Sequence, residues 1–447
     1  MPPRLPCLLA DPPPGERLWL TNARLLDGTG TAPRSGVSVL VNGGRIEGVA
    51  DASEPPLDGA TSIDLDGRTI LPGLVDAHAH VGGGFEKPEA LHGAEPILRG
   101  MLGHLLAAEL RAVVRMGITT VRDVGSIGDI VIEARQAMRY GAFEGPRILT
   151  CGRIVSPTGP GGRFFAGMYR EADGEDDVRR AVREQFRYGA DFVKVMTTGA
   201  RTVELEDPDP PQLTRKELAA LVNESHRMGY RVCAHCEGLA GTELAIEEGV
   251  DTIEHGMYLG QRPDLLERMA ASGQVLVPTL SFLLGLVEAG VSTWTPALVE
   301  LGKHNVEQAR LTLVAARAAG VRLAMGFDSS PLRSATNELL AMIDFGLPTA
   351  DALVAATSGG AHAVGLGEHV GTIEKGKLAD LVVVDGDPLL EPELLCDPDR
   401  IWLVLRLGKP VGGTALERVS PFPCETAAAA SSETSVSVSK RWTQTVS

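Results

Sequence analysis

One pattern repeats along most of this sequence: a short apolar run rich in β-branched residues, a polar loop, and an amphipathic segment that ends at glycine. The apolar runs lie at 70–80, 117–125, 146–152, 190–199, 230–238, 251–256, 274–280 and 321–330. Helical segments between them include 97–117, 213–229 and 305–320, and the closing glycine supplies a left-handed cap. Strands that alternate with helices indicate a parallel sheet, and eight units predict a closed (β/α)₈ TIM barrel.

The two ends of the chain depart from this pattern. Residues 17–69 and 370–412 alternate apolar and polar residues between turn signals, which predicts antiparallel β structure. We expect both ends to build one small β-sandwich domain. The predicted organisation is a mobile N-terminal tail at 1–16, the first sandwich part at 17–69, the barrel at 70–369, the second sandwich part at 370–420, and a mobile C-terminal tail at 421–447.

The charge balance excludes one class of partner. Asp and Glu number 58 against 42 Lys and Arg, which gives a formal net charge of −16 and no basic surface for nucleic acid. No run of 18 apolar residues predicts a membrane span, and prolines and an Asp interrupt the first twenty residues where a signal peptide needs an apolar core. We expect a cytoplasmic protein with a small-molecule substrate, and a homo-oligomer is compatible with the sequence.

The cysteines do not predict a disulfide framework. The six are sparse and irregularly spaced for a chain of 447 residues. Cys233 and Cys236 form a CxxC pair, but no second pair exists to complete a zinc site. We expect both to be buried free thiols.

Two histidines, His78 and His80, stand at the end of the first predicted barrel strand. Side chains two residues apart on a strand point to the same face, so both imidazoles can enter the barrel mouth and share one metal ion. This pair alone is only suggestive, because two histidines in a barrel can equally be satisfied core residues.

Four further polar residues belong to other predicted strands. His235 ends the fifth strand, His255 the sixth and Asp328 the eighth, and Lys194 lies within the fourth among apolar neighbours. The carboxyl ends of barrel strands share one rim, so these side chains are predicted to converge with the histidine pair. Each residue alone has a structural explanation; Lys194, for example, could extend from its strand to solvent. The convergence of all six residues favours a metal centre.

These residues lie in motifs that resemble the amidohydrolase superfamily over roughly residues 17–412. The motifs are LPGLVDAHAH (71–80), VKVMTTG (193–199), AHC (234–236), IEHG (253–256), GFDSS (326–330) and the segment 357–388. The sequence looks similar to the branch that holds Xaa-Pro dipeptidase-like and imidazolonepropionase-like enzymes. By this resemblance His78, His80 and Asp328 hold a first metal, and His235 and His255 hold a second.

The resemblance also implies that carbon dioxide carboxylates Lys194 and that the resulting carbamate bridges the two metals. Zinc is the first expectation for both divalent ions, with manganese, iron or cobalt as alternatives. Asp328, the carbamate and a bridging hydroxide would largely balance the two cations, whereas an unmodified ammonium would repel them. The apolar neighbours of Lys194 favour its neutral amine, the form that reacts with carbon dioxide.

The predicted function is hydrolysis of an amide or peptide C–N bond in a small substrate, either a dipeptide or an N-acyl amino acid. The hydroxide between the metals attacks the carbonyl, and Asp328 is the catalytic residue that carries the proton to the leaving nitrogen. One alternative is a mononuclear cyclic-amide hydrolase or deaminase with an unmodified Lys194. Another is a catalytically silent scaffold barrel, against which the presence of all six ligand residues argues.

The substrate residues are expected on the loops that follow the strands. Relatives often have a histidine in a TGGHG-like loop after the third strand, whereas this chain reads SPTGPGGRFF at 156–165 and offers only Arg163 as a charged group. Arg163 and Arg201 are the candidates for holding a substrate carboxylate, and Tyr258 is the candidate for hydrogen-bonding the substrate.

Several other polar residues receive lesser roles. Asp76 is expected to support the fold or orient a ligand, and Arg122 and Asp123 either touch substrate or pair with each other. His362 is expected to pack between barrel and sandwich. A solvated position on helices or outer loops is expected for His92, His104, His226, His304 and His369.

Overall fold

The structure is a computed structural model. It describes residues 17–51, 53–54, 58–82, 96–203, 205–290, 295–329 and 331–417, with the side chains of 96–100 excepted. The predicted tails at 1–16 and 421–447 and the prediction for His92 lie outside these residues. In the described part of the chain, no helix is both long and apolar enough to cross a membrane.

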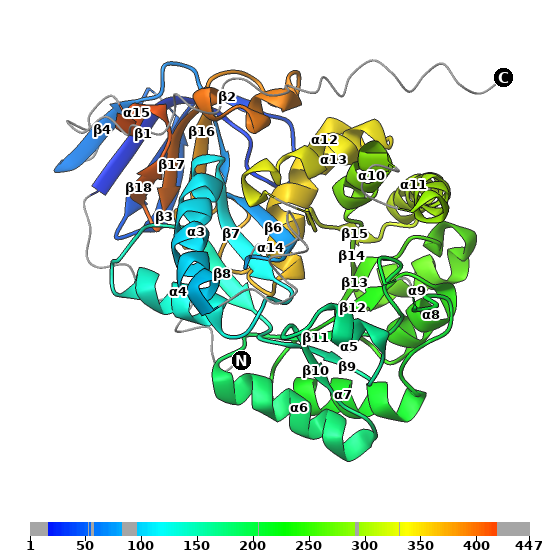
Figure 1. Cartoon of the computed structure of the whole chain (residues 1–447). Coiled ribbons are helices and arrows are strands. Elements are labelled where there is room, and N and C mark those ends of the chain that lie inside the picture. The colour runs from blue at the N-terminus through cyan, green and yellow to red at the C-terminus, as the bar shows by residue number, and fades with distance from the viewer. Residues whose placement is uncertain are drawn as a thin grey trace.

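Strands from both chain ends form one eight-stranded sheet, which Figure 1 shows as blue and orange strands lying together. The strands are β1 (Arg17–Leu25), β2 (Arg34–Asn42), β3 (Arg45–Asp51), β4 (Ala60–Asp64), β5 (Thr69–Pro72), β16 (Leu381–Val384), β17 (Ile401–Arg406) and β18 (Lys409–Gly412). Their order is β18-β17-β16-β5-β1-β2-β3, and β4 pairs with β1. The prediction that the two chain ends together build one β unit beside a barrel is confirmed. The expectation of antiparallel pairing holds only in part, because β1 pairs in parallel with β4 and β5.

The barrel strands follow the predicted order. They are β6 (Leu74–Ala79), β7 (Ile118–Asp123), β8 (Arg147–Thr150), β9 (Ile154–Ser156), β11 (Val193–Met196), β12 (Val232–Cys236), β13 (Thr252–His255), β14 (Val275–Val277) and β15 (Arg322–Leu323), with β10 (Tyr169–Glu171) beside β9. The predicted strand 70–80 is divided at Gly73, because β5 pairs with β16 in the terminal sheet. The predicted strand 146–152 contains β8 alone, and β9 follows it as a separate short strand that pairs with β11.

Backbone hydrogen bonds link the last strand region to the first. The Ala77 N–H donates to the Met325 carbonyl at 2.8 Å, and the Asp328 N–H donates to the His78 carbonyl at 2.9 Å. On the other side of the barrel, the Asp191 N–H donates to the Thr150 carbonyl at 2.8 Å. The strands therefore form the predicted barrel.

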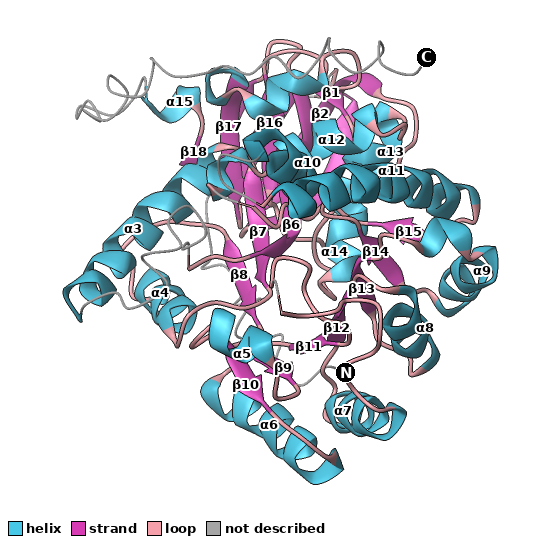
Figure 2. Cartoon of the chain, turned by 45° about the vertical axis from the view of Figure 1, so that its right-hand side comes forward, coloured by secondary structure: helices cyan, strands magenta, loops and turns pink. Residues whose placement is uncertain are grey.

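Helices flank the barrel strands (Figure 2). The α-helices are α3 (Pro96–Arg115), α4 (Ile130–Arg139), α5 (Pro160–Phe164), α6 (Glu175–Tyr188), α7 (Arg215–Arg227), α8 (Leu239–Glu247), α9 (Pro263–Ser272), α10 (Leu280–Ala289), α11 (Pro296–Ala318), α12 (Asn337–Asp344), α13 (Thr349–Val354), α14 (Gly360–Ala363) and α15 (Thr414–Glu417). Shorter helical turns are η1 (Leu259–Gln261), η3 (Leu332–Ser334), η4 (Ala355–Gly359), η5 (Pro392–Cys396) and η6 (Pro398–Arg400).

Local sequence signals explain where α7 begins and ends. Thr214 and Glu217 form a reciprocal capping box, which satisfies free N–H groups at the helix start. Gly229 follows the helix with a φ of +79°, a conformation that glycine adopts without steric cost. Leu218 and Leu221 are buried in the main apolar core. The helix therefore packs its apolar face inward and ends where the next strand must start.

Candidate active site

His78, His80 and Asp328 come together at the barrel mouth as predicted. Asp328 Oδ1 lies 3.4 Å from His78 Nε2 and 3.3 Å from His80 Nε2. Each of the three residues offers a ligand atom, and these atoms all lie within 4.8 Å of one another. Burial would raise the pKa of Asp328, but the charge of His78 and hydrogen bonds from both histidines hold it well below its ordinary value. The group is therefore an anionic carboxylate between two imidazoles.

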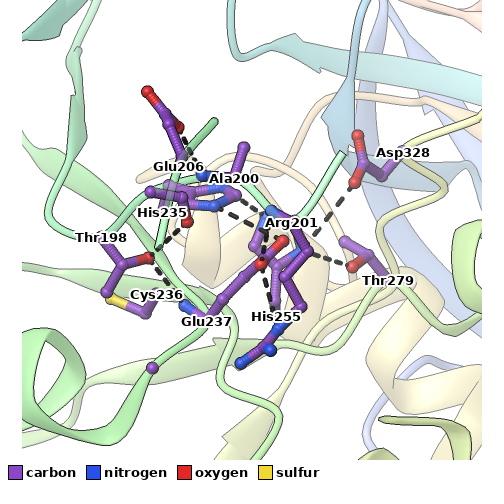
Figure 3. Close-up of polar contacts among 12 residues, drawn as sticks. Thr198, Ala200, Arg201, Glu206, His235, Cys236, Glu237, His255, Thr279 and Asp328 are labelled. Atoms are coloured by element: carbon purple, nitrogen blue, oxygen red, sulfur yellow. Dashed lines mark hydrogen bonds and ion pairs between the residues drawn. The ribbon is translucent and has the colours of Figure 1, made fainter. Parts of the chain in front are cut away.

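His235 and His255 form the neighbouring part of the site (Figure 3). His255 Nε2 lies 2.9 Å from His235 Nδ1, and His255 Nδ1 lies 2.7 Å from Thr279 Oγ1. The ring centroids of His255 and His78 are 5.1 Å apart, so this pair adjoins the first three residues. Burial lowers the pKa of His255 to about 3 and that of His235 well below its ordinary value. Both imidazoles are therefore neutral at pH 7, the form that binds metal.

Two of these residues have an unusual backbone conformation that directs their side chains toward the site. His255 has a φ of +69° and Asp328 a φ of +47°, in the left-handed region that non-glycine residues rarely adopt. Thr279, which contacts His255, has a φ of +52°. Such conformations cost free energy and persist where surrounding structure enforces them, often at functional sites.

Lys194 is a fully buried lysine on β11 with a relative exposure of 2%. Its Nζ has no hydrogen-bond partner among the described atoms. Strand β11 pairs in parallel with β12, where Lys194 lies opposite Cys233, two residues before His235. Burial of an ammonium group without a partner costs free energy. A covalent modification of this amine or an anionic partner would remove that cost.

Glu254 is a site residue that the sequence analysis did not identify. Its Oε2 lies 2.6 Å from His78 Nδ1, and its Oε1 lies 2.7 Å from Arg122 Nη2. Burial would raise the pKa of Glu254, but Arg122 and His78 hold it well below its ordinary value. The sequence gives no signal for this residue, because on a regular strand the neighbour of an inward-facing His255 points to the opposite face. The left-handed turn at His255 lets both side chains reach the barrel interior.

Comparisons with known proteins agree with this geometry. The sequence profile of the amidohydrolase family matches residues 69–411. The chain belongs to the amidohydrolase family. It is therefore an enzyme, an amidohydrolase that acts on carbon–nitrogen bonds of small molecules, and the family is generally metal-dependent.

Three similar proteins show the range within this amidohydrolase family. Ochratoxinase of Aspergillus niger is 28% identical over 368 residues, covering 76% of this chain and 75% of its own. Imidazolonepropionase of Sphingopyxis alaskensis is 27% identical over 409 residues, covering 83% of this chain and 93% of its own. The crystal structure of a Xaa-Pro dipeptidase with methionine in its active site has a TM-score of 0.79 and 28% identity, covering 89% of this chain and 100% of its own.

The predicted substrate residues of this amidohydrolase already contact protein groups. Arg201 packs its guanidinium 5.2 Å from the Tyr258 ring centroid, and its Nε lies 3.3 Å from Glu237 Oε2. Its Nη2 lies 3.4 Å from Asp209 Oδ1. Burial raises the pKa of Glu237 to about 7, although Arg201 opposes that shift. Arg163 lies on α5, exposed and separate from these contacts.

Tyr258 is committed to a neighbouring helix. Its hydroxyl donates to Asn305 Oδ1 at 2.7 Å, and Asn305 lies on α11. The ring of Tyr258, rather than its hydroxyl, is therefore the part that supports Arg201. The hydroxyl would have to leave Asn305 to bond a substrate.

Aspartates near the first strand have structural roles. Asp76 accepts hydrogen bonds from the backbone N–H groups of His78 and Phe327, each at 3.1 Å, and burial raises its pKa to about 7. Asp123 accepts from Ser126 Oγ at 2.6 Å and from Thr150 Oγ1 at 2.7 Å. The idea that Arg122 and Asp123 pair with each other is wrong, because Arg122 turns inward to Glu254.

Most of the remaining histidines and cysteines agree with their predicted exposure, but His369 does not, because it is partly buried rather than solvated. His104, His226 and His304 are exposed, and His362 and His369 are partly buried. Cys233 and Cys236 are buried free thiols, as predicted. Burial raises the pKa of each of these two thiols to about 12, so neither is a thiolate at neutral pH.

Proposed function

We propose that this amidohydrolase cleaves an amide or peptide C–N bond in a dipeptide or N-acyl amino acid with two divalent metal ions. His78, His80 and Asp328 would hold the first ion, and His235 and His255 the second. The observation that carries this proposal is the cluster of His78, His80 and Asp328, with the contacting pair His235 and His255 beside it. A fully buried lysine, Lys194, on the strand next to His235 supports it.

The side chains present fit such ions. Burial keeps the imidazoles of His235 and His255 neutral, and Asp328 is anionic. His255 lies 2.9 Å from His235 and 3.8 Å from Asp328, so the three side chains adjoin one another. The Nζ of Lys194 lacks a hydrogen-bond partner among the described atoms, and reaction of its neutral amine with carbon dioxide would yield a carbamate anion and a proton. That carbamate would supply the negative charge that two adjacent cations need.

Bound divalent ions would polarise the substrate carbonyl and acidify water for its attack. Asp328 supplies the general base, because its low pKa keeps the carboxylate ionised at neutral pH. Its Oδ2 lies 3.8 Å from His255 Nδ1, so the carboxylate lies between the two groups of proposed ligands. Its carboxylate would take the proton from water and pass it to the leaving nitrogen. A carboxylate with a low pKa is a weak base. Proton transfer from the attacking water to Asp328 therefore depends on the position of the carboxylate beside the proposed metal ligands.

Arg201 would hold the carboxylate of the substrate. Its guanidinium has Glu237 on one side and the exposed Asp209 on the other, with relative side-chain exposures of 6% and 77%. A substrate carboxylate could replace Asp209 without disturbing the buried contact to Glu237. Arg163 would provide a second cation from α5.

A mononuclear cyclic-amide hydrolase is the second candidate. The similarity to imidazolonepropionase supports it, as does the finding that His78, His80 and Asp328 form the compact three-residue group. In that case Lys194 stays unmodified and one ion suffices.

A substrate panel tests the proposal. Purified enzyme would be assayed with L-Xaa-L-Xaa dipeptides, N-acyl amino acids, ochratoxin, lactones and cyclic imides. We expect turnover of the first two classes, and a raised KM in Arg201→Ala but not in Arg215→Ala, whose exposed guanidinium pairs with Glu247 and Glu248. Activity confined to cyclic compounds would reject the dipeptidase assignment, and an unchanged KM in both Arg201→Ala and Arg163→Ala would reject the carboxylate clamp.

A further inference from the structure

Glu254 contacts a proposed metal ligand, His78, on the ring nitrogen opposite the one that faces Asp328. Its side chain is fully buried, with one oxygen 2.6 Å from His78 Nδ1 and the other 2.7 Å from Arg122 Nη2. Thr252 Oγ1 donates to the same Oε1 at 2.5 Å. Both carboxylate oxygens are therefore occupied, and His78 Nε2 is the nitrogen left for Asp328 and an ion.

Arg122 is fixed from several directions. Its Nε donates to the Ala77 carbonyl at 2.5 Å, and its Nη1 donates to Thr252 Oγ1 at 3.0 Å. Its guanidinium lies over the Phe192 ring at 5.5 Å. These contacts come from β6, β13 and the residue before β11, so Arg122 holds Glu254 in place rather than reaching a substrate.

Carboxylates lie farther from the second histidine pair, with Glu237 Oε1 3.6 Å from His235 Nε2 and Asp328 Oδ2 3.8 Å from His255 Nδ1. The Nδ1 atoms of His80 and His255 have neutral hydrogen-bond partners. His80 Nδ1 lies 2.6 Å from the Gly125 carbonyl, and His255 Nδ1 lies 2.7 Å from Thr279 Oγ1. A carboxylate partner fixes a histidine tautomer and raises the basicity of its metal-binding nitrogen more than a neutral acceptor does. The first proposed metal site therefore has a carboxylate hydrogen-bonded to a ligand histidine, whereas the carboxylates near His235 and His255 lie beyond hydrogen-bond distance.

We propose that Arg122 and Glu254 are positioning residues that hold His78 as an Nε2 ligand and make the His78–His80–Asp328 site the tighter of the two metal sites. This inference rests on the proposed metal-binding function. Removal of the Glu254 carboxylate should weaken the first site and leave the second nearly unchanged.

Metal titration of Glu254→Gln tests the inference. Apo-protein would be titrated with Co²⁺ against a chelator, and we expect the tighter dissociation constant to rise about 10- to 100-fold with the weaker one within about threefold. The matched control is Glu338→Gln, another fully buried glutamate, which accepts from the backbone N–H groups of Leu280 and Ser281 at 2.8 and 2.7 Å. A folded Glu254→Gln protein with both wild-type affinities would overturn the inference.

A second measurement uses only the wild-type protein. Crystals of protein loaded with one equivalent of Co²⁺ should show the anomalous peak beside His78, His80 and Asp328, with His78 bound through Nε2. A peak beside His235 and His255, or coordination by Glu254 itself, would contradict the inference. If wild type binds one ion in total at the first site, the two-metal proposal fails while this inference stands.

Discussion

Two side chains of the barrel mouth, those of His255 and Asp328, owe their direction to an unusual backbone conformation. Asp328 has a φ of +47°, and its N–H donates to the His78 carbonyl at 2.9 Å, so its position is tied to the first ligand strand. An amide in place of this carboxylate keeps the shape but cannot accept a proton.

Asp328→Asn should therefore keep the fold and part of the metal while losing turnover. We expect kcat to fall on the order of 10² to 10⁴, the usual contribution of general acid–base catalysis, or more if metal is also lost. Steady-state kinetics with parallel metal analysis would check this. A decrease in kcat of less than about tenfold, with metal content unchanged, would show that Asp328 is no proton carrier.

At this scale the sequence predicted which histidines meet but not what supports them. His78, His80, His235, His255 and Asp328 could be placed because strand ends of a barrel share a rim. Glu254 could not be placed in this way, because it is the positive φ of His255 that lets the side chains of Glu254 and His255 both reach the barrel interior. The existing partners of Arg201 and Tyr258 were also hidden, since they depend on loop conformations that spacing does not encode.

Elements bring these residues into register through close backbone contacts. Gly326 lies between β15 and Asp328, and a Cβ there would meet Val277 Cγ1 at 2.4 Å and His78 Cβ at 2.7 Å. The segment that carries Asp328 can approach the first strand only because residue 326 lacks a side chain.

Gly326→Ala should push the Asp328 segment away from His78. We expect a loss of roughly 1–3 kcal/mol in the free energy of unfolding, as for other overpacked sites, together with weaker metal binding. Gly103→Ala is the matched control, because a Cβ on that residue of α3 would meet nothing within 4 Å. Denaturant unfolding of both variants would test this, and equal stabilities would refute the packing argument.

The glycine that closes each predicted helix was a reliable signal at the scale of elements. Gly117, Gly229 and Gly320 have φ values of +81°, +79° and +75°. The breaks within strands were not predictable in the same way. The division at Gly73 depends on pairing between β5 and β16, which lie more than 300 residues apart in the chain.

For the whole molecule, one buried ion pair links the barrel to the terminal sheet. Arg147, the first residue of β8, donates to Asp380, which also accepts from the Leu407 N–H at 2.8 Å. Both side chains are nearly inaccessible, with relative exposures of 3% and 1%. The pair therefore connects the start of β8 to the residue before β16, and the Leu407 N–H links Asp380 to the turn between β17 and β18.

Asp380→Asn should destabilise the protein strongly, because it leaves Arg147 buried beside a neutral group. Loss of one partner of a buried pair typically costs about 3–5 kcal/mol. Thermal unfolding of Asp380→Asn, of Arg147→Met and of the double variant would measure the coupling. Additive effects of the two substitutions would contradict a direct interaction across the two parts of the fold.

The architecture itself was predictable from the sequence, because a strand and helix repeat allows few folds. The order of the barrel strands and the joint sheet of both chain ends follow from hydrophobic periodicity and turn residues. The metal count does not, because it depends on whether the amine of Lys194 is modified.

Elemental analysis of the active, desalted enzyme tests the central claim most directly. We predict about two divalent ions per wild-type chain, and in Lys194→Ala the loss of at least one ion and of most activity, because the bridging anion is gone. Lys194→Glu returns a carboxylate and should recover part of the metal. An active wild-type enzyme that holds a single tightly bound ion would contradict the two-metal account.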